Sequence, residues 1–288
     1  MQTSHLLARR QLLSLLGGTC LAASASPSAW AQTAALSKKT ASSAGWRLLI
    51  NEAVTGEVNS FVLTNRYRPL ADFISLQIKG RAVAVEPVVD IKRFMTVAQG
   101  AIKPELVFGK SVNQLAKLVR DNGYQPIVKR ADAYKSAFIV LKDSPIKTLA
   151  DAAGVKIFMP DAVSATSAVA LAELRWQKVA ATRITHVKFQ EEVAQSITNG
   201  FAQMGAVNPT VAKKWVEDGG RVVAQTQPVV NWSLLASPSV TPEAVVLLRD
   251  ALMGTNAEAA AVLTAVGVKE WAKAERKDYL DLLTYTKE

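Results

Sequence analysis

From Trp46 onward, short apolar runs alternate with segments whose apolar residues recur at helical spacing. Short apolar runs bounded by turn residues are typical of buried strands, and apolar residues three and four positions apart are typical of an amphipathic helix. The segment from Arg66 to Ile78 has the second pattern, with Leu70, Phe73 and Ile74 on one face. Pro69 is expected in the first turn of that helix, where its missing N–H costs nothing.

The same pattern assigns most of the chain. It predicts strands at 47–52, 83–88, 105–108, 134–141, 155–159 and 229–235, and another around His186. It predicts helices at 66–78, 90–99, 113–120, 148–153, 164–180, 192–198 and 211–215, and a helical region over 242–286 with breaks near Gly254 and Gly267. Strands and helices that alternate in this way predict an α/β chain with a mostly parallel sheet.

The N-terminal stretch has the features of an export signal. Arg9 and Arg10 precede an apolar run over 12–23, and small residues lead to Ala29-Trp30-Ala31. This order predicts a signal peptide over 1–31 with cleavage after Ala31, and hence a periplasmic protein. The arginine pair also resembles a twin-arginine export signal. A retained N-terminal anchor is the alternative, and residues 32–45 are predicted to form a flexible leader.

Few residues of the chain could support metal or nucleophilic chemistry. The single cysteine, Cys20, lies in the predicted signal, and His186 is the only histidine after it. We therefore expect no disulfide, no metal site and no cofactor. The sequence also has no nucleotide-binding glycine loop, no H-E-x-x-H and no nucleophile elbow, so we expect no enzymatic activity. A hydrolase on an α/β scaffold remains as an alternative hypothesis.

The chain is basic, with a formal charge of +10, which becomes +8 when Arg9 and Arg10 are removed with the signal. A basic surplus favours anionic partners. The lysines and arginines are scattered, without a run of five like charges, so nucleic acid is not the expected partner. Steering of an anionic ligand and a soluble basic surface are both consistent with this distribution.

Several segments together resemble the periplasmic substrate-binding proteins of phosphate-, phosphite- and phosphonate-type ABC importers. Tyr67–Ile74 is similar to the family's Y-x-P-L-A-x-[YF]-[LI] pattern, and Tyr134–Val140 to its Y-x-S strand. Asp143–Gly154 looks like its D-S-x-I-x-S-L-x-D-L-x-G segment, and Asp161–Ser167 like its D-P-x-S-T-S-G turn. The resemblance covers about residues 46–240, in the family's order.

The resemblance implies a two-lobed type II periplasmic binding protein fold, in which two hinge-crossing strands join α/β lobes around a ligand. It places lobe 1 at 46–134 and 236–288 and lobe 2 at 135–235, with crossings near Tyr134–Ser136 and Val229–Leu235. It implies the periplasmic solute-binding component of an ABC importer. The partners would be a small anion, such as a phosphonate, phosphite or phosphate, and the importer's membrane subunits. We expect a monomer.

The best local candidate for an anion site is the turn formed by Ser164, Thr166 and Ser167. These hydroxyl residues precede a long predicted helix, whose first N–H groups and dipole favour an anion. Serine and threonine at a helix start are also ordinary capping residues, so capping is the alternative interpretation.

The resemblance adds further candidates. Tyr134 and Ser136 lie in the Y-x-S strand, where they would donate to the ligand or only form part of the hinge. Ser111 and Lys110 match a lobe 1 turn, and of the two we favour Ser111. Trp232 lies on the return crossing and is a candidate aromatic contact, whereas Trp176 and Trp215 are expected in the core.

The sequence also departs from the family pattern. Lys103 and Gln203 stand where the family has aspartates, and Gln190–Val193 replaces its G-S-H-D segment. Acidic groups there hold the amine of an aminoalkyl phosphonate, so this ligand class becomes doubtful. Glu191 and Glu192 could substitute, or could only favour the helix dipole. A second hypothesis is therefore a periplasmic sensor or adaptor that presents its ligand state to a signalling partner.

Overall fold

The computed structural model describes residues 45–52, 59–179 and 183–288 of the chain. The predictions for the signal peptide (1–31) and for almost all of the leader (32–45) lie outside these residues. The helices are α2 (Ser60–Gln77), α3 (Ile91–Gln99), α4 (Val112–Asp121), α5 (Ala165–Trp176), α6 (Gln190–Thr198), α7 (Pro209–Glu217), α8 (Pro242–Leu252), α9 (Ala257–Val266), α10 (Arg276–Thr286) and the 3₁₀ turn η1 (Leu149–Ala152). The strands are β1 (Trp46–Asn51), β2 (Val83–Pro87), β3 (Leu106–Gly109), β4 (Gln125–Arg130), β5 (Ala137–Val140), β6 (Lys156–Met159), β7 (Arg183–His186), β8 (Met204–Val207), β9 (Arg221–Gln225), β10 (Ser233–Ala236) and β11 (Trp271–Lys273).

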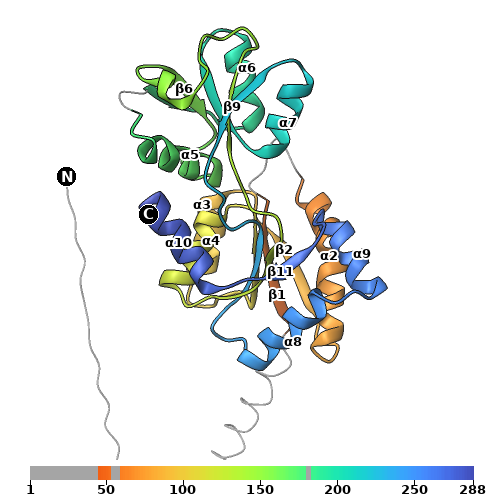
Figure 1. Ribbon diagram of the computed structural model, residues 1–288. Helices are drawn as coiled ribbons and strands as arrows, with labels where there is room; N and C mark the ends of the chain where they lie inside the picture. Colours follow the sequence, from red (N-terminus) through yellow and green to blue (C-terminus); the bar gives the residue numbers. More distant parts are fainter. Residues whose placement is uncertain (1–44, 53–58, 180–182) are drawn as a thin grey trace, which may run out of the picture. The chain divides into compact units, whose positions relative to one another are not determined.

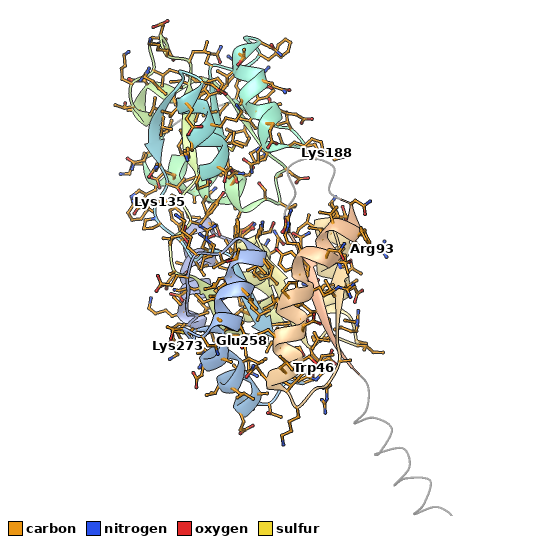
Figure 2. All side chains as sticks on the ribbon, turned by 90° about the vertical axis from the view of Figure 1, so that its right-hand side faces the viewer. Trp46, Arg93, Lys135, Lys188, Glu258 and Lys273 are labelled. Atoms are coloured by element: carbon orange, nitrogen blue, oxygen red, sulfur yellow. The ribbon has the colours of Figure 1, made fainter. Side chains whose placement is uncertain are left out.

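The first sheet has six strands in the order β11-β4-β10-β3-β1-β2. Strand β1 is parallel to β2 and β3, and β10 lies antiparallel between β3 and β4. The carboxyl ends of β1, β3 and β4 therefore lie at the same edge as the amino end of β10. In Figure 2, Trp46 at the start of β1 lies far from Lys135, so β1 runs toward the side where the two sheets are joined.

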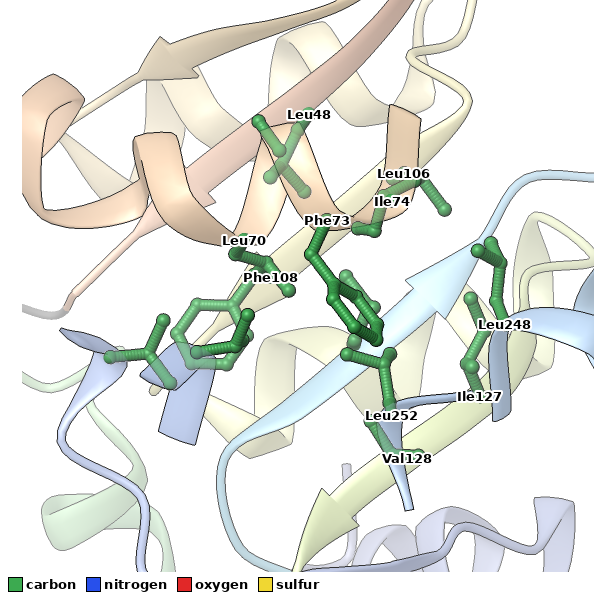
Figure 3. Packing of buried hydrophobic residues seen from close by; sticks show 14 of the residues in the cluster. Leu48, Leu70, Phe73, Ile74, Leu106, Phe108, Ile127, Val128, Leu248 and Leu252 are labelled. Carbon is green, nitrogen blue, oxygen red and sulfur yellow. The ribbon is translucent and has the colours of Figure 1, made fainter. Parts of the chain in front are cut away.

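Successive residues of a strand point to opposite faces of its sheet, so the side chains of β1 lie in two separate cores. Leu48 and Ile50 pack with α2, α8 and α9, and Leu49 packs with α3, α4 and α10. Figure 1 shows these two helical layers on the two faces of the sheet. Figure 3 shows the first core, where Phe73 of α2 lies among strand and helix side chains that include Phe108 and Leu252.

The second sheet has five strands in the order β7-β6-β8-β5-β9. Strand β6 is parallel to β7 and β8, and β5 is antiparallel to β8 and β9. Helix α5 packs on one face of this sheet, and α6 and α7 pack on the other. Trp215 is buried as expected, and its indole N–H donates to Val140 O over 2.9 Å. Trp176 is 67% exposed, so the expectation that it lies in the core is wrong.

The chain passes from one sheet to the other at Tyr134 and returns at Val229. These residues form an antiparallel bridge with reciprocal backbone hydrogen bonds of 2.9 and 3.0 Å. The two sheets, each covered by helices and linked by two adjacent segments, make up the predicted type II periplasmic binding fold. The exact lobe boundaries stay a prediction.

Several predicted boundaries were wrong. Helix α2 begins at Ser60, so Pro69 lies inside the helix and not in its first turn. The strands predicted at 134–141 and 229–235 are shorter, because the crossing residues are bridged outside the sheets. Strands β4 and β9 were not predicted, and β11 interrupts the region predicted to be helical. Within the described ranges, no helix has the length and apolar character that crossing a bilayer requires.

Candidate ligand-binding site

The turn before α5 is held together by its own serines. Ser164 is the N-cap of α5, and its side chain accepts the Ser167 N–H over 3.2 Å. The Ser167 hydroxyl is fully buried and donates to Pro160 O over 2.7 Å. Both hydroxyls therefore shape the turn in this structure, and the capping interpretation describes what they do here.

Thr166 lies in the middle of a buried set of polar side chains, which we call the hydroxyl cluster: Tyr134, Ser136, Thr166 and Gln190. The hydroxyls of Tyr134 and Thr166 are 2.7 Å apart. Ser136 Oγ lies 3.3 Å from Tyr134 Oη and 3.4 Å from Thr166 O. Gln190 Nε2 donates to Thr166 Oγ1 over 2.8 Å. The structure therefore brings together three of the predicted candidates, Tyr134, Ser136 and Thr166, around the hydroxyl group of Tyr134.

The hydroxyl cluster can donate a proton to an acceptor outside it. Gln190 already donates to Thr166, and Ser136 donates either to Tyr134 or to a backbone carbonyl. Tyr134 and Thr166 bond to each other, so only one of their two hydroxyl protons is used in that bond. Burial raises the pKa of Tyr134, which keeps its proton in place. The other proton can go to an external acceptor or, from Tyr134, to Ser136 Oγ, which lies 3.3 Å away.

Gln190 was not among the predicted site residues. It is the first residue of α6, and its amide oxygen accepts the N–H of Asn208, the N-cap of α7, over 2.9 Å. One amide group therefore links the starts of three helices, α5, α6 and α7. The signal was present in the sequence, since Gln190 begins the segment that replaces the family's G-S-H-D.

The start of α4, on the first sheet, lies against the turn before α5. Ser111 is the N-cap of α4, is 4% exposed and makes no capping hydrogen bond with its hydroxyl. One turn further along, Asn113 Nδ2 and Gln114 Nε2 both donate to Val163 O, over 3.2 and 3.1 Å. Val163 directly precedes Ser164, so the structure brings Ser111 to the same region as the hydroxyl cluster.

Four residues from neighbouring strands form a row at the edge of the first sheet, which we call the charged edge: Arg130, Trp232, Lys110 and Glu52. Lys110 Nζ lies 3.9 Å from the ring centroid of Trp232, and Arg130 Cζ lies 4.4 Å from it. Lys110 Nζ is also 3.3 Å from Glu52 Oε2. The row follows from strand order, because β4, β10, β3 and β1 are adjacent, Arg130 ends β4 and the other three residues directly flank their strands.

Glu52 is buried at the end of the row but remains ionised. Burial alone would raise the pKa of its carboxyl group. The charge of Lys110 and the hydrogen bonds from Tyr67 and Arg66 together lower the pKa by more than burial raises it. Tyr67 Oη donates over 2.6 Å, and Arg66 donates over 2.7 Å. Burial also lowers the pKa of Lys110, and Glu52 only partly offsets this effect.

The residues that depart from the family pattern have structural partners. Gln203 Oε1 accepts the Lys156 N–H over 3.0 Å. Glu192 caps α6 by accepting the N–H groups of Lys188 and Phe189, over 2.9 and 3.2 Å. His186 Nδ1 lies 2.7 Å from Pro160 O. Among the residues that the structure describes, no group of acidic, histidine or cysteine side chains is arranged to hold a metal.

Solved structures share this arrangement of sheets. XAC2383 from Xanthomonas citri, bound to chloride ion, matches with a TM-score of 0.68 at 15% identity, over 84% of this chain and 97% of that one. PhnD1 from Prochlorococcus marinus, in complex with methylphosphonate, matches with 0.65 at 15% identity, over 84% and 97%. A binding protein component of an ABC phosphonate transporter from Pseudomonas aeruginosa (PA3383) matches with 0.60 at 17% identity, over 85% and 87%. No curated protein matches the chain in sequence.

The fold is therefore that of the type II periplasmic binding proteins. The sequence profile of the periplasmic substrate-binding proteins of phosphonate ABC transporters matches residues 53–279, and the chain belongs to this family. It is a family of periplasmic binding components and not of enzymes, which excludes the hydrolase alternative.

Proposed function

We propose that this protein is the periplasmic solute-binding component of an ABC importer and that it binds a small oxyanion, such as a phosphonate, phosphite or phosphate, at the hydroxyl cluster. The proposal rests mainly on the network of Thr166 with Tyr134 and Gln190 at the start of α5. A tetrahedral oxyanion has several acceptor oxygens and no need for acidic partners, which suits a cluster of neutral donors.

Four further observations support this assignment. The first N–H groups of α5 lack helical partners, and the helix dipole favours negative charge at that end. Ser164 and Ser167 fix the backbone of the turn that presents these groups. Ser111, at the start of α4, has a hydroxyl that is not used in capping. PhnD1 from Prochlorococcus marinus, which shares the fold, was solved with methylphosphonate.

In this proposal, residues 46–134 and 236–288 form one lobe and 135–235 the other, and the chain acts as an exported monomer. The Tyr134–Val229 bridge is the hinge. The bound oxyanion is delivered to the membrane subunits of the importer.

The test is calorimetric titration and thermal unfolding of the purified protein with methylphosphonate, phosphite, phosphate and sulfate. A ligand at about 100 times its Kd should raise the free energy of unfolding by about 2.7 kcal/mol. Thr166→Val should abolish the response, and Thr264→Val, on the exposed surface of α9, should leave it intact. Absence of any response in the unaltered protein, or a full response in Thr166→Val, contradicts the proposal.

A sensor or adaptor role is the second candidate, because Lys103 and Gln203 stand where the family has aspartates. Uptake of labelled methylphosphonate by cells with and without the protein separates the two roles. An importer component requires uptake to fall when the protein is removed, whereas a sensor leaves the uptake rate itself unchanged.

A further inference from the structure

The charged edge has more positive than negative charge. The single carboxylate of Glu52 serves both Arg66, at 2.7 Å, and Lys110, at 3.3 Å. Arg130 has a partner of its own, Asp132, at 2.6 Å. Glu52 therefore balances one of its two cations, and among the residues that the structure describes here one positive charge has no counter-ion.

The excess charge is held in a partly buried place. The side chains of Lys110 and Arg130 are 17% and 19% exposed. Both lie against Trp232, and a cation above an indole ring is favoured by the ring quadrupole. Trp232 carries no net charge, however, so it holds the cations without neutralising them.

An unbalanced charge in such a place costs free energy, because water no longer solvates it fully. An anion that docks beside Lys110 and Arg130 relieves that cost. Asp132 takes hydrogen bonds from Nε and Nη2 of Arg130, and the Nη1 side of the guanidinium group can still donate to a carboxylate.

The charged edge and the hydroxyl cluster adjoin the same pair of helix starts. Lys110 is followed at once by Ser111 and the first turn of α4, whose Asn113 and Gln114 side chains bind Val163 O. Val163 leads through Ser164 to Thr166. The two groups of residues therefore flank the same pair of helix starts, those of α4 and α5.

We propose that the ligand is a phosphonocarboxylate, with its phosphonate group at Thr166 and Tyr134 and its carboxylate at Lys110 and Arg130 beside Trp232. This assignment rests on the proposed function and narrows its substrate class. The charged edge disfavours an aminoalkyl phosphonate, because the ammonium group would meet two cations.

The experiment compares three ligands that share a phosphonate group and differ in the charge of the other end: methylphosphonate, 2-aminoethylphosphonate and phosphonoacetate. Affinities are measured by titration calorimetry on the unaltered protein and on Lys110→Gln. This variant leaves Glu52 paired with Arg66 alone, so its charged edge is neutral, and it should fold; circular dichroism checks this. Lys213→Gln is the control, because Lys213 is 80% exposed on α7.

We expect phosphonoacetate to bind the unaltered protein about tenfold more tightly than methylphosphonate. One charge-assisted hydrogen bond to the carboxylate accounts for a gain in affinity of this size. The 2-aminoethyl compound should bind more weakly than either. Lys110→Gln should lower the affinity for phosphonoacetate more than that for methylphosphonate and so remove the preference, and Lys213→Gln should leave the preference as it is.

Two results overturn the inference while the proposed function stands: equal affinity of the unaltered protein for phosphonoacetate and methylphosphonate, or a preference that survives in Lys110→Gln. If Lys110→Gln does not fold, the ranking of the three ligands by the unaltered protein decides alone. If none of the three binds, the proposed function is wrong as well.

Discussion

Gln190 donates to the Thr166 hydroxyl over 2.8 Å although 24 residues separate them in the chain. The same amide accepts the Asn208 N–H, so that Gln190 uses both a donor and an acceptor at the starts of α5 and α7. The Asn208 N–H is a donor that an anion would also seek, whereas the Thr166 hydroxyl accepts from Gln190 and can still donate its own proton. Gln190 is thus a neutral occupant of the region where an oxyanion is proposed to bind.

Gln190→Glu tests whether an anion binds in the region around Gln190. The carboxylate keeps the shape of the side chain and can still accept the Asn208 N–H, so we expect the fold to be retained. The added negative charge should lower the affinity for methylphosphonate by tenfold or more, since like charges in a partly desolvated site repel strongly. Titration calorimetry measures the effect.

Gln203→Glu is the matched control for that variant. Gln203 is exposed and also accepts a backbone N–H, that of Lys156, but it lies just before β8 and beside the first residue of β6, at the opposite edge of the sheet from the start of α5. Affinity should be unchanged there. An equal loss in both variants, or no loss in either, would mean that no anion binds near Gln190.

Thr166→Val should also destabilise the fold without ligand. Valine keeps the volume of threonine but leaves the Gln190 Nε2 donor and the Tyr134 hydroxyl without their buried partner. An unsatisfied buried polar group costs about 1–3 kcal/mol, which should appear as a lower free energy of unfolding in urea. A variant as stable as the unaltered protein would show that the cluster adds nothing to folding.

Glu52 predicts a specific loss of stability in acid. Its pKa in the folded protein is below the ordinary value of 4.5, because Lys110, Tyr67 and Arg66 outweigh the effect of burial. Below that ordinary value the unfolded chain binds more protons than the folded one, so the free energy of unfolding falls as pH decreases through the folded pKa. The contribution is complete above pH 4.5 and disappears below the folded pKa.

Glu52→Gln should therefore be less stable than the unaltered protein at neutral pH and should lose less stability between neutral pH and strong acid. Chemical denaturation at a series of pH values measures both slopes. Glu217→Gln, which removes a carboxylate that is 62% exposed, should keep the slope of the unaltered protein. Parallel curves for Glu52→Gln and the unaltered protein would contradict the prediction.

Trp215 covers Gly220 so closely that no side chain fits there. A Cβ atom at residue 220 would lie 2.1 Å from Trp215 Nε1, the atom that donates to Val140 O. Gly220→Ala should therefore force the indole to shift and should destabilise the fold by about 1–3 kcal/mol.

The double variant Gly220→Ala with Trp215→Phe provides the check. Phenylalanine lacks the atom that the new methyl group meets, so the double variant should be less destabilised than the sum of the two single ones. Additive effects, measured by urea denaturation, would mean that the clash is relieved in some other way.

The local pattern predicted what depends on neighbouring residues. The helix that begins after Ser164, capped by that serine, is confirmed, and so is the alternation of strands and helices through the first sheet. Strand β4 was missed because it contains Pro126 and ends in Lys129 and Arg130, which is not an apolar run. It is stabilised by β10, whose residues are about a hundred positions away.

The candidate site shows the same limit. Ser164, Thr166 and Ser167 were found because they are adjacent, and Tyr134 and Ser136 because they resemble a family motif. Gln190 and the contact of Lys110 with Trp232 were not predicted, because both depend on which strands become neighbours in a sheet. The spacing of apolar residues along the chain does not show in which order the strands pair within a sheet.

The place of β10 between β3 and β4 also sets the order in which the protein can fold. As the chain leaves the ribosome, β1, β2, β3 and β4 emerge first, but the place between β3 and β4 stays empty until residue 236 is available. All strands of the second sheet, over residues 137–225, have emerged and are available before that point. During synthesis, the second sheet can therefore form before the first sheet can be completed.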